Sequence, residues 1–169
     1  MKADEAIQQA INYEEKIRDV YMEAAESIDN PAIKNILQAL GKEEQHHVEY
    51  LEHKLKQWLE NGEITLDQLE TTVPSPQKIE AGLQKVKFKI LVDNKEDELK
   101  ILEKAREVEI ATKNFYHDMT RKMTDRMQEM FAHFLEIEEG HLAIVEAEID
   151  AVMGMGFWFD FGEFNLEKE

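Results

Sequence analysis

Glutamate, tyrosine and histidine recur in the same order in the two halves of this sequence. The recurring residues are Glu14, Tyr21, Glu44 and His47 in the first half, and Glu109, Tyr116, Glu138 and His141 in the second. The two glutamates are 30 positions apart in the first half and 29 apart in the second, so the halves align almost without a gap. Four carboxylates and two imidazoles are the ligand set of a two-metal site inside a four-helix bundle.

The position of each Glu-x-x-His step on its helix is a stronger signal than the step itself. In a chain this rich in glutamate, such pairs also arise by chance, and Glu43 with His46 is a second pair beside Glu44 with His47. Only Glu44 and His47 share the apolar stripe of their predicted helix, where i and i+3 side chains lie next to each other. We therefore predict that Glu44 and His47 face inward, and that the Glu138 pair does the same.

Four carboxylates on the inward faces of a bundle need positive charge close by. An unpaired buried carboxylate costs several kcal/mol or takes up a proton. No lysine or arginine recurs on these stripes, so metal cations are the natural compensation. The four glutamates also lie at similar distances from the two hairpin turns, which places them at one level of the bundle. Carboxylate and neutral imidazole suit iron or manganese, and zinc is possible.

Apolar periodicity and turn residues predict four helices, over residues 3–28, 31–61, 94–122 and 124–154. Pro31 fits a first helical turn, Gly62 a left-handed C-terminal cap, and Asn94 and Thr124 fit N-caps. Short turns make two antiparallel hairpins, and residues 62–94 form a connection long enough to run the length of the bundle. This predicts an all-α, ferritin-like four-helix bundle with one long crossover.

The 169 residues fit one domain at 1–154 followed by an aromatic tail at 155–169. We expect the tail either to fold over its own bundle or to lie at a subunit interface.

Charge and composition exclude several classes of function. The net charge of −17 argues against binding nucleic acid or an anionic membrane surface. The absence of cysteine excludes disulfides, iron–sulfur ligation and a four-cysteine iron site within these residues. No apolar run approaches the ~20 residues of a membrane span, and the N-terminus lacks a signal-peptide pattern. We therefore expect a cytoplasmic protein.

Over residues 3–153 these motifs make the chain resemble the ferritin-like di-iron superfamily, and most closely the di-iron domain of rubrerythrins. Two features differ from that family. Rubrerythrins typically add a rubredoxin domain with a four-cysteine iron site, and this chain has no cysteine. They also place a further ligand glutamate three residues after the third-helix glutamate, where this chain has Thr112. That glutamate is associated with the iron shift of their peroxide cycle.

The resemblance implies an oxidoreductase with two iron ions per chain that reduces hydrogen peroxide or dioxygen. It implies an external electron donor such as rubredoxin, and a homo-oligomer, with a dimer favoured. The implied ligands are Glu44 and Glu138 as bridges, Glu14 and Glu109 as terminal ligands, and His47 and His141 with one ion each. Tyr21 and Tyr116 are either hydrogen-bond partners of these ligands or ordinary core aromatics. Two alternatives stay open: a ferritin-type ferroxidase that handles iron, and a metal-binding helical module without catalysis.

Overall fold

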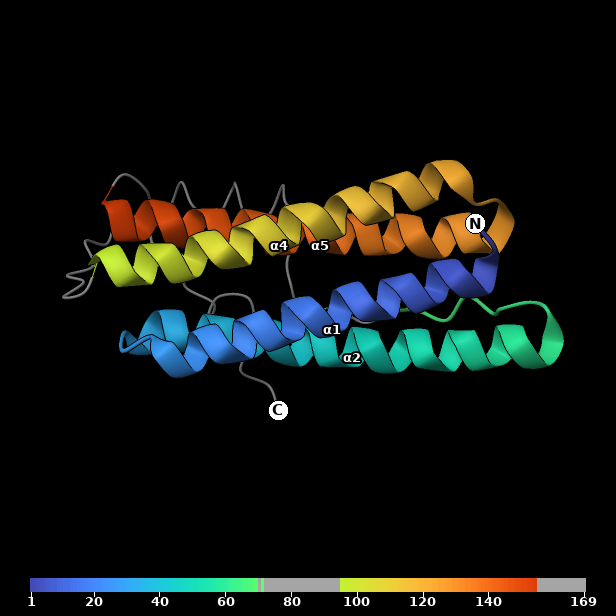
Figure 1. Ribbon diagram of the computed structural model, residues 1–169, viewed down its shortest axis with the longest axis horizontal. Helices are drawn as coiled ribbons and strands as arrows, with labels where there is room; N and C mark the ends of the chain where they lie inside the picture. Colours follow the sequence, from blue (N-terminus) through green and yellow to red (C-terminus); the bar gives the residue numbers. More distant parts are fainter. Residues whose placement is uncertain (70, 72–94, 155–169) are drawn as a thin grey trace.

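The computed structural model describes residues 1–69, 71 and 95–154. Its helices are α1 (Ala3–Ser27), α2 (Pro31–Asn61), α4 (Lys95–Lys122) and α5 (Asp125–Met153). They form two antiparallel hairpins, α1–α2 and α4–α5, whose turns lie at opposite ends of the molecule, and α1 also packs against α4 (Figure 1). The predicted all-α four-helix bundle is confirmed, and the described part of the chain contains no strand.

Some sequence predictions concern residues outside the described ranges. These are the capping by Asn94, most of the 62–94 crossover and the whole 155–169 tail. Among the helices that are described, none is long and apolar enough to span a membrane.

The helix ends follow the turn chemistry of the sequence. The Asn30 side chain accepts hydrogen bonds from the backbone N–H groups of Ala32 and Ile33, at 3.0 and 3.3 Å, directly before α2. Gly62 ends α2 with φ of 71°, a left-handed conformation that glycine adopts without strain. Thr124 precedes α5 as predicted, but its side chain forms no cap. Its hydroxyl donates instead to the Asp125 carboxylate, at 3.0 Å.

The apolar core divides into two clusters along the bundle. One cluster contains Ile17, Leu37, Leu102 and Ile149, and the other contains Ile7, Leu51, Tyr116 and Phe131. In each of the four helices, the boundary between the clusters falls at the glutamates and histidines that recur in the sequence. The polar residues therefore occupy one layer, closed by apolar side chains above and below.

A buried lysine fixes the chain that follows α2. The Lys54 side chain has no exposed surface, and its ammonium lies 2.5 Å from the Asp67 carboxylate and 4.9 Å from the centre of the Tyr50 ring. It also donates to the Thr65 hydroxyl, at 3.3 Å. Sequence periodicity did not predict this residue to be buried. These contacts hold the first part of the crossover against α2 and lead the chain back along the bundle.

Glu148 is a buried carboxylate outside the polar layer. It lies seven residues after His141 on α5, has 1% of its surface exposed, and neither carboxylate oxygen has a hydrogen-bond partner within the described residues. Burial alone raises the pKa of the Glu148 carboxyl to about 8. This carboxyl therefore carries a proton in the folded protein at neutral pH.

The raised pKa of Glu148 predicts a pH dependence of stability. Between pH 4.5 and 8 the folded state holds a proton that the unfolded state has released, so the free energy of unfolding falls as the pH rises. The loss is at most about 5 kcal/mol, since one pH unit contributes up to about 1.4 kcal/mol. Glu148→Gln removes this titration and should flatten the profile. Guanidinium unfolding between pH 6 and 9 measures it, with exposed Glu139→Gln as the control. Parallel profiles for Glu148→Gln and wild type would contradict the assignment.

Candidate metal centre

All six candidate ligands of the sequence analysis come together in the polar layer. The residues are Glu14 on α1, Glu44 and His47 on α2, Glu109 on α4, and Glu138 and His141 on α5, all with 0% of their surface exposed. They form two overlapping groups, in each of which the potential ligand atoms lie within 4.8 Å of one another. One group joins Glu14 and His47 to Glu44 and Glu138, and the other joins Glu109 and His141 to the same two glutamates.

His47 faces three of the carboxylates through one ring nitrogen. Its Nδ1 atom lies 2.9 Å from Glu44 Oε2, 3.1 Å from Glu14 Oε2 and 3.7 Å from Glu138 Oε1. The ring also packs edge-on against Phe134, with 5.3 Å between centroids, and this contact restricts the orientation of the imidazole. The imidazole thus presents Nδ1 to the centre of the polar layer.

His141 repeats this arrangement for the second group. Its Nδ1 atom lies 2.6 Å from Glu44 Oε1, 3.7 Å from Glu138 Oε2 and 3.8 Å from Glu109 Oε1. The rings of His47 and His141 are nearly parallel, at 8° and with 5.6 Å between centroids. The two halves of the chain therefore place equivalent imidazoles on either side of a shared pair of glutamates.

The two recurring tyrosines connect the halves to each other. The Tyr21 hydroxyl on α1 donates to Glu109 on α4, and the Tyr116 hydroxyl on α4 donates to Glu14 on α1. Both side chains are fully buried. Burial, followed by the nearby carboxylates, raises the pKa of both phenols well above its usual value. The tyrosines therefore act as hydrogen-bond donors that orient the carboxylates, as one of the two sequence interpretations expected.

The atoms that face the centre fit metal ions better than they fit one another. Oxygens of Glu44, Glu109 and Glu138 and the Nδ1 atom of His141 lack a hydrogen-bond partner within the described residues, although all are buried. The 2.6 Å contact between His141 Nδ1 and Glu44 Oε1 also lacks hydrogen-bond geometry. Buried polar atoms are normally satisfied, so this set of inward-facing donor atoms suits cations. Two divalent ions would balance the four carboxylates.

Without cations, protons have to compensate the charge of the polar layer. Burial raises the pKa of Glu44, Glu109 and Glu138, and neighbouring carboxylates add to this shift. Burial by itself would lower the pKa of His47 and His141, but the surrounding carboxylates, with Glu44 first, raise both well above the usual value. Ligands must lose these protons to bind a metal, so metal affinity should fall as the pH is lowered.

The family of the protein follows from comparison of its sequence with known families. The rubrerythrin family profile matches residues 5–149, which is almost the whole bundle. The chain belongs to the rubrerythrin family. This is a ferritin-like family of di-iron proteins, which supports metal binding by the buried carboxylates and histidines.

One solved structure shares the fold of this rubrerythrin-family chain. It is described as hypothetical protein Pfu-1136390-001 from Pyrococcus furiosus, with a TM-score of 0.64, 22% sequence identity and 94% of each chain covered. At this identity the likeness shows the fold alone. No curated protein matches the chain.

Thr112 takes no part in the polar ligand set of this rubrerythrin-family bundle. Its side chain is fully buried, and its hydroxyl donates to the Val108 backbone carbonyl at 3.0 Å, one turn earlier in α4. The threonine therefore satisfies its own hydroxyl and supplies no carboxylate in place of the additional glutamate. The other histidines of the chain lie away from the site and are exposed: His46, His53, His117 and His133.

Glu43 is a residue that sequence reasoning did not assign to the site. The residue is 5% exposed and its carboxylate lies against His141, although the adjacent Glu44 occupies the centre. Burial would raise the pKa of Glu43, but the contact with His141 outweighs it and holds that pKa at about 2. The recurring motif gave no sign of this role, because the second half has Ile137 at the equivalent position.

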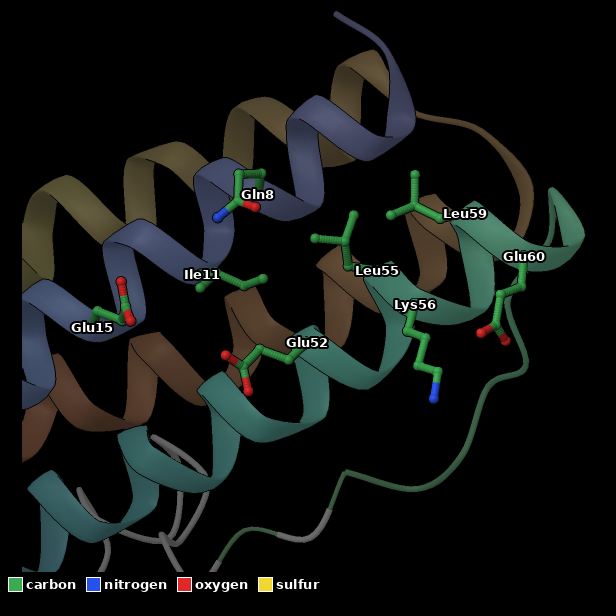
Figure 2. A pocket seen from close by; sticks show the side chains of 8 residues that line it. All are labelled: Gln8, Ile11, Glu15, Glu52, Leu55, Lys56, Leu59 and Glu60. Carbon is green, nitrogen blue, oxygen red and sulfur yellow. The ribbon is translucent and has the colours of Figure 1, made fainter.

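A groove on the surface of the bundle lies apart from the polar layer. Gln8, Ile11 and Glu15 on α1 line one side of it (Figure 2). The other side is formed by α2 residues that include Leu55 and Leu59 (Figure 2). None of the six candidate ligands lines this groove. The groove has acidic, basic and apolar residues in its lining and is separate from the candidate metal centre.

Proposed function

We propose that this chain is a di-iron oxidoreductase that reduces hydrogen peroxide, or dioxygen, with electrons from an external donor. The observation that carries the proposal is the pair of overlapping ligand groups that share Glu44 and Glu138. Membership of a di-iron family supports the choice of iron. Manganese and zinc fit the same donor atoms; zinc is not redox-active and cannot serve this reaction, and the family favours iron over manganese.

Each ligand has a role that follows from its place in the two groups. Glu44 and Glu138 belong to both groups, so they would bridge the two ions. Glu14 and Glu109 each belong to one group and would be terminal ligands. His47 and His141 would each complete one ion through Nδ1, the nitrogen that faces the carboxylates.

Two reduced iron ions can supply the two electrons that, with two protons, convert one hydrogen peroxide molecule to two water molecules. The protein holds the metal ligands in position and excludes water from the site. Tyr21 and Tyr116 keep their protons and hold Glu109 and Glu14 in place through their hydroxyls. The two apolar clusters close the layer at both sides. Because the ligands have no exposed surface, the site suits an oxidant as small as peroxide or dioxygen.

The electrons for repeated turnover would come from a centre outside these residues. The sequence has no cysteine, so it cannot hold the four-cysteine iron site that carries electrons in a rubredoxin. Starting from reduced metal, one site could complete a single two-electron reaction and would then need a donor. A reduced rubredoxin is the donor that the family resemblance suggests.

Anaerobic loading with two Fe(II) per chain, followed by separate rapid mixing with peroxide and with dioxygen, tests the proposal. We expect peroxide to oxidise the bound iron faster than dioxygen does, with a stoichiometry of one peroxide per two iron ions. Addition of reduced rubredoxin should then allow continuous consumption of peroxide. Absorbance and residual peroxide are the two readouts. Buffer with the same free Fe(II) is the control.

Two outcomes would contradict the proposal in different ways. Iron that is inert to peroxide, rapidly oxidised by dioxygen and retained as a mineral would favour the iron-handling alternative. Bound metal that reacts with neither oxidant would favour a metal-binding helical module without catalysis.

A further inference from the structure

Glu43 is placed behind the imidazole of His141, on the side away from the carboxylate centre. Its Oε1 atom lies 3.6 Å from His141 Nε2, while His141 Nδ1 faces Glu44 at 2.6 Å. The Thr71 hydroxyl donates to the same Glu43 oxygen and so ties the carboxylate to the crossover chain. Glu43 is thus held at the outer edge of one ligand group.

The two histidines differ in what lies behind them. His47 presents Nδ1 to the centre as His141 does, and neither Nε2 atom has a hydrogen-bond partner within the described residues. The Nε2 atom of His141 has the Glu43 carboxylate at 3.6 Å, whereas all the carboxylate contacts of His47 in the described residues are made through Nδ1. Ile137 stands at the position of the second half that corresponds to Glu43. The two ligand groups are therefore alike in their ligands but differ in the residue behind the histidine.

A carboxylate behind a metal-binding imidazole has a known physical effect. It attracts a proton to the nitrogen that it faces, which leaves the lone pair of the other nitrogen free for the metal. It also makes the ligand nitrogen more basic, and loss of such a partner typically weakens metal binding by about 10- to 100-fold. On the His141 side, Glu43 would favour a proton on Nε2 and a metal at Nδ1.

We infer that Glu43 is a positioning residue that makes the His141 side the tighter of the two metal positions, so that this side fills first. The inference rests on the proposed two-metal centre. The six ligands are equivalent in type between the two halves, so they give neither metal position an advantage. The expected order in which the positions bind metal follows from the difference between Glu43 and Ile137.

Anaerobic titration of the metal-free protein with Co(II), followed by its visible absorption and by competition with a chelator, tests this inference. We expect the wild type to bind two ions in two separate steps. Glu43→Gln keeps the size of the side chain and an acceptor for Thr71, but removes the charge. It should weaken the first step about tenfold or more and leave the total at two ions. Exposed Glu52→Gln, on the same helix, is the matched control.

Further variants assign each binding step to one histidine and provide a second test if Glu43→Gln does not fold. His141→Ala should abolish the tight step, and His47→Ala should abolish the weak one. Thr71→Val removes the donor that holds Glu43 and should weaken the first step in the same direction but less, so it tests the idea if Glu43→Gln does not fold. Two equal steps in the wild type, or an unchanged first step in the Glu43 and Thr71 variants, would overturn the inference and leave the metal centre standing. A wild type that binds no Co(II) would overturn both.

Discussion

Replacement of Glu138 by alanine is expected to remove at least one of the two metal ions. Glu138 belongs to both ligand groups, and neither of its oxygens has a hydrogen-bond partner within the described residues. Its loss therefore takes one carboxylate away from both ion positions. The same reasoning applies to Glu44, which also belongs to both groups. Metal content per chain, measured after anaerobic loading with Fe(II) and removal of free ions, gives the result.

The control for this experiment is Glu139→Ala, which changes an exposed glutamate next to Glu138. It should leave the metal content unchanged. Metal binding should also raise the melting temperature of the wild type, since a ligand that binds only the folded state stabilises it. Glu138→Ala should lose most of this increase. If Glu138→Ala keeps two ions per chain and the full increase in melting temperature, the assignment of Glu138 as a bridge is wrong.

Replacement of His47 by alanine should lower metal binding strongly, whereas replacement of the adjacent His46 should not. His47 is fully buried, with Nδ1 at 2.9 Å from Glu44 and 3.1 Å from Glu14, whereas the adjacent His46 is exposed. Loss of this ligand would remove a metal–nitrogen bond and take away the imidazole that faces the Glu14 carboxylate. We expect about one ion per chain in His47→Ala and two in His46→Ala.

The pair of variants is informative because both remove an imidazole from the same turn of the same helix. The change in intrinsic helix propensity is therefore the same in the two variants. Metal content and the Co(II) absorption spectrum are the readouts. The opposite pattern, with metal lost from His46→Ala only, would show that the Glu-Glu-Gln-His-His run binds metal in the other register.

The sequence by itself determined the helices and the inward face of each one. Apolar periodicity distinguished Glu44 and His47 from Glu43 and His46, because a helix turns each residue by a fixed angle and a stripe of apolar residues marks its buried side. Asn30 and Gly62 determined where α2 begins and ends, since their backbone and side-chain preferences act over a few residues only. The matched spacing of the two halves placed the four glutamates at one level.

The tertiary structure decided which neighbour each inward side chain meets. Spacing within α1 and α4 could not show that Tyr21 binds Glu109 and that Tyr116 binds Glu14, because these bonds depend on how the two hairpins pack. The buried positions of Glu43 and Lys54 depend on the crossover chain, through Thr71 and Asp67. Periodicity describes one helix at a time, whereas burial and partners depend on contacts between segments that are far apart in the sequence.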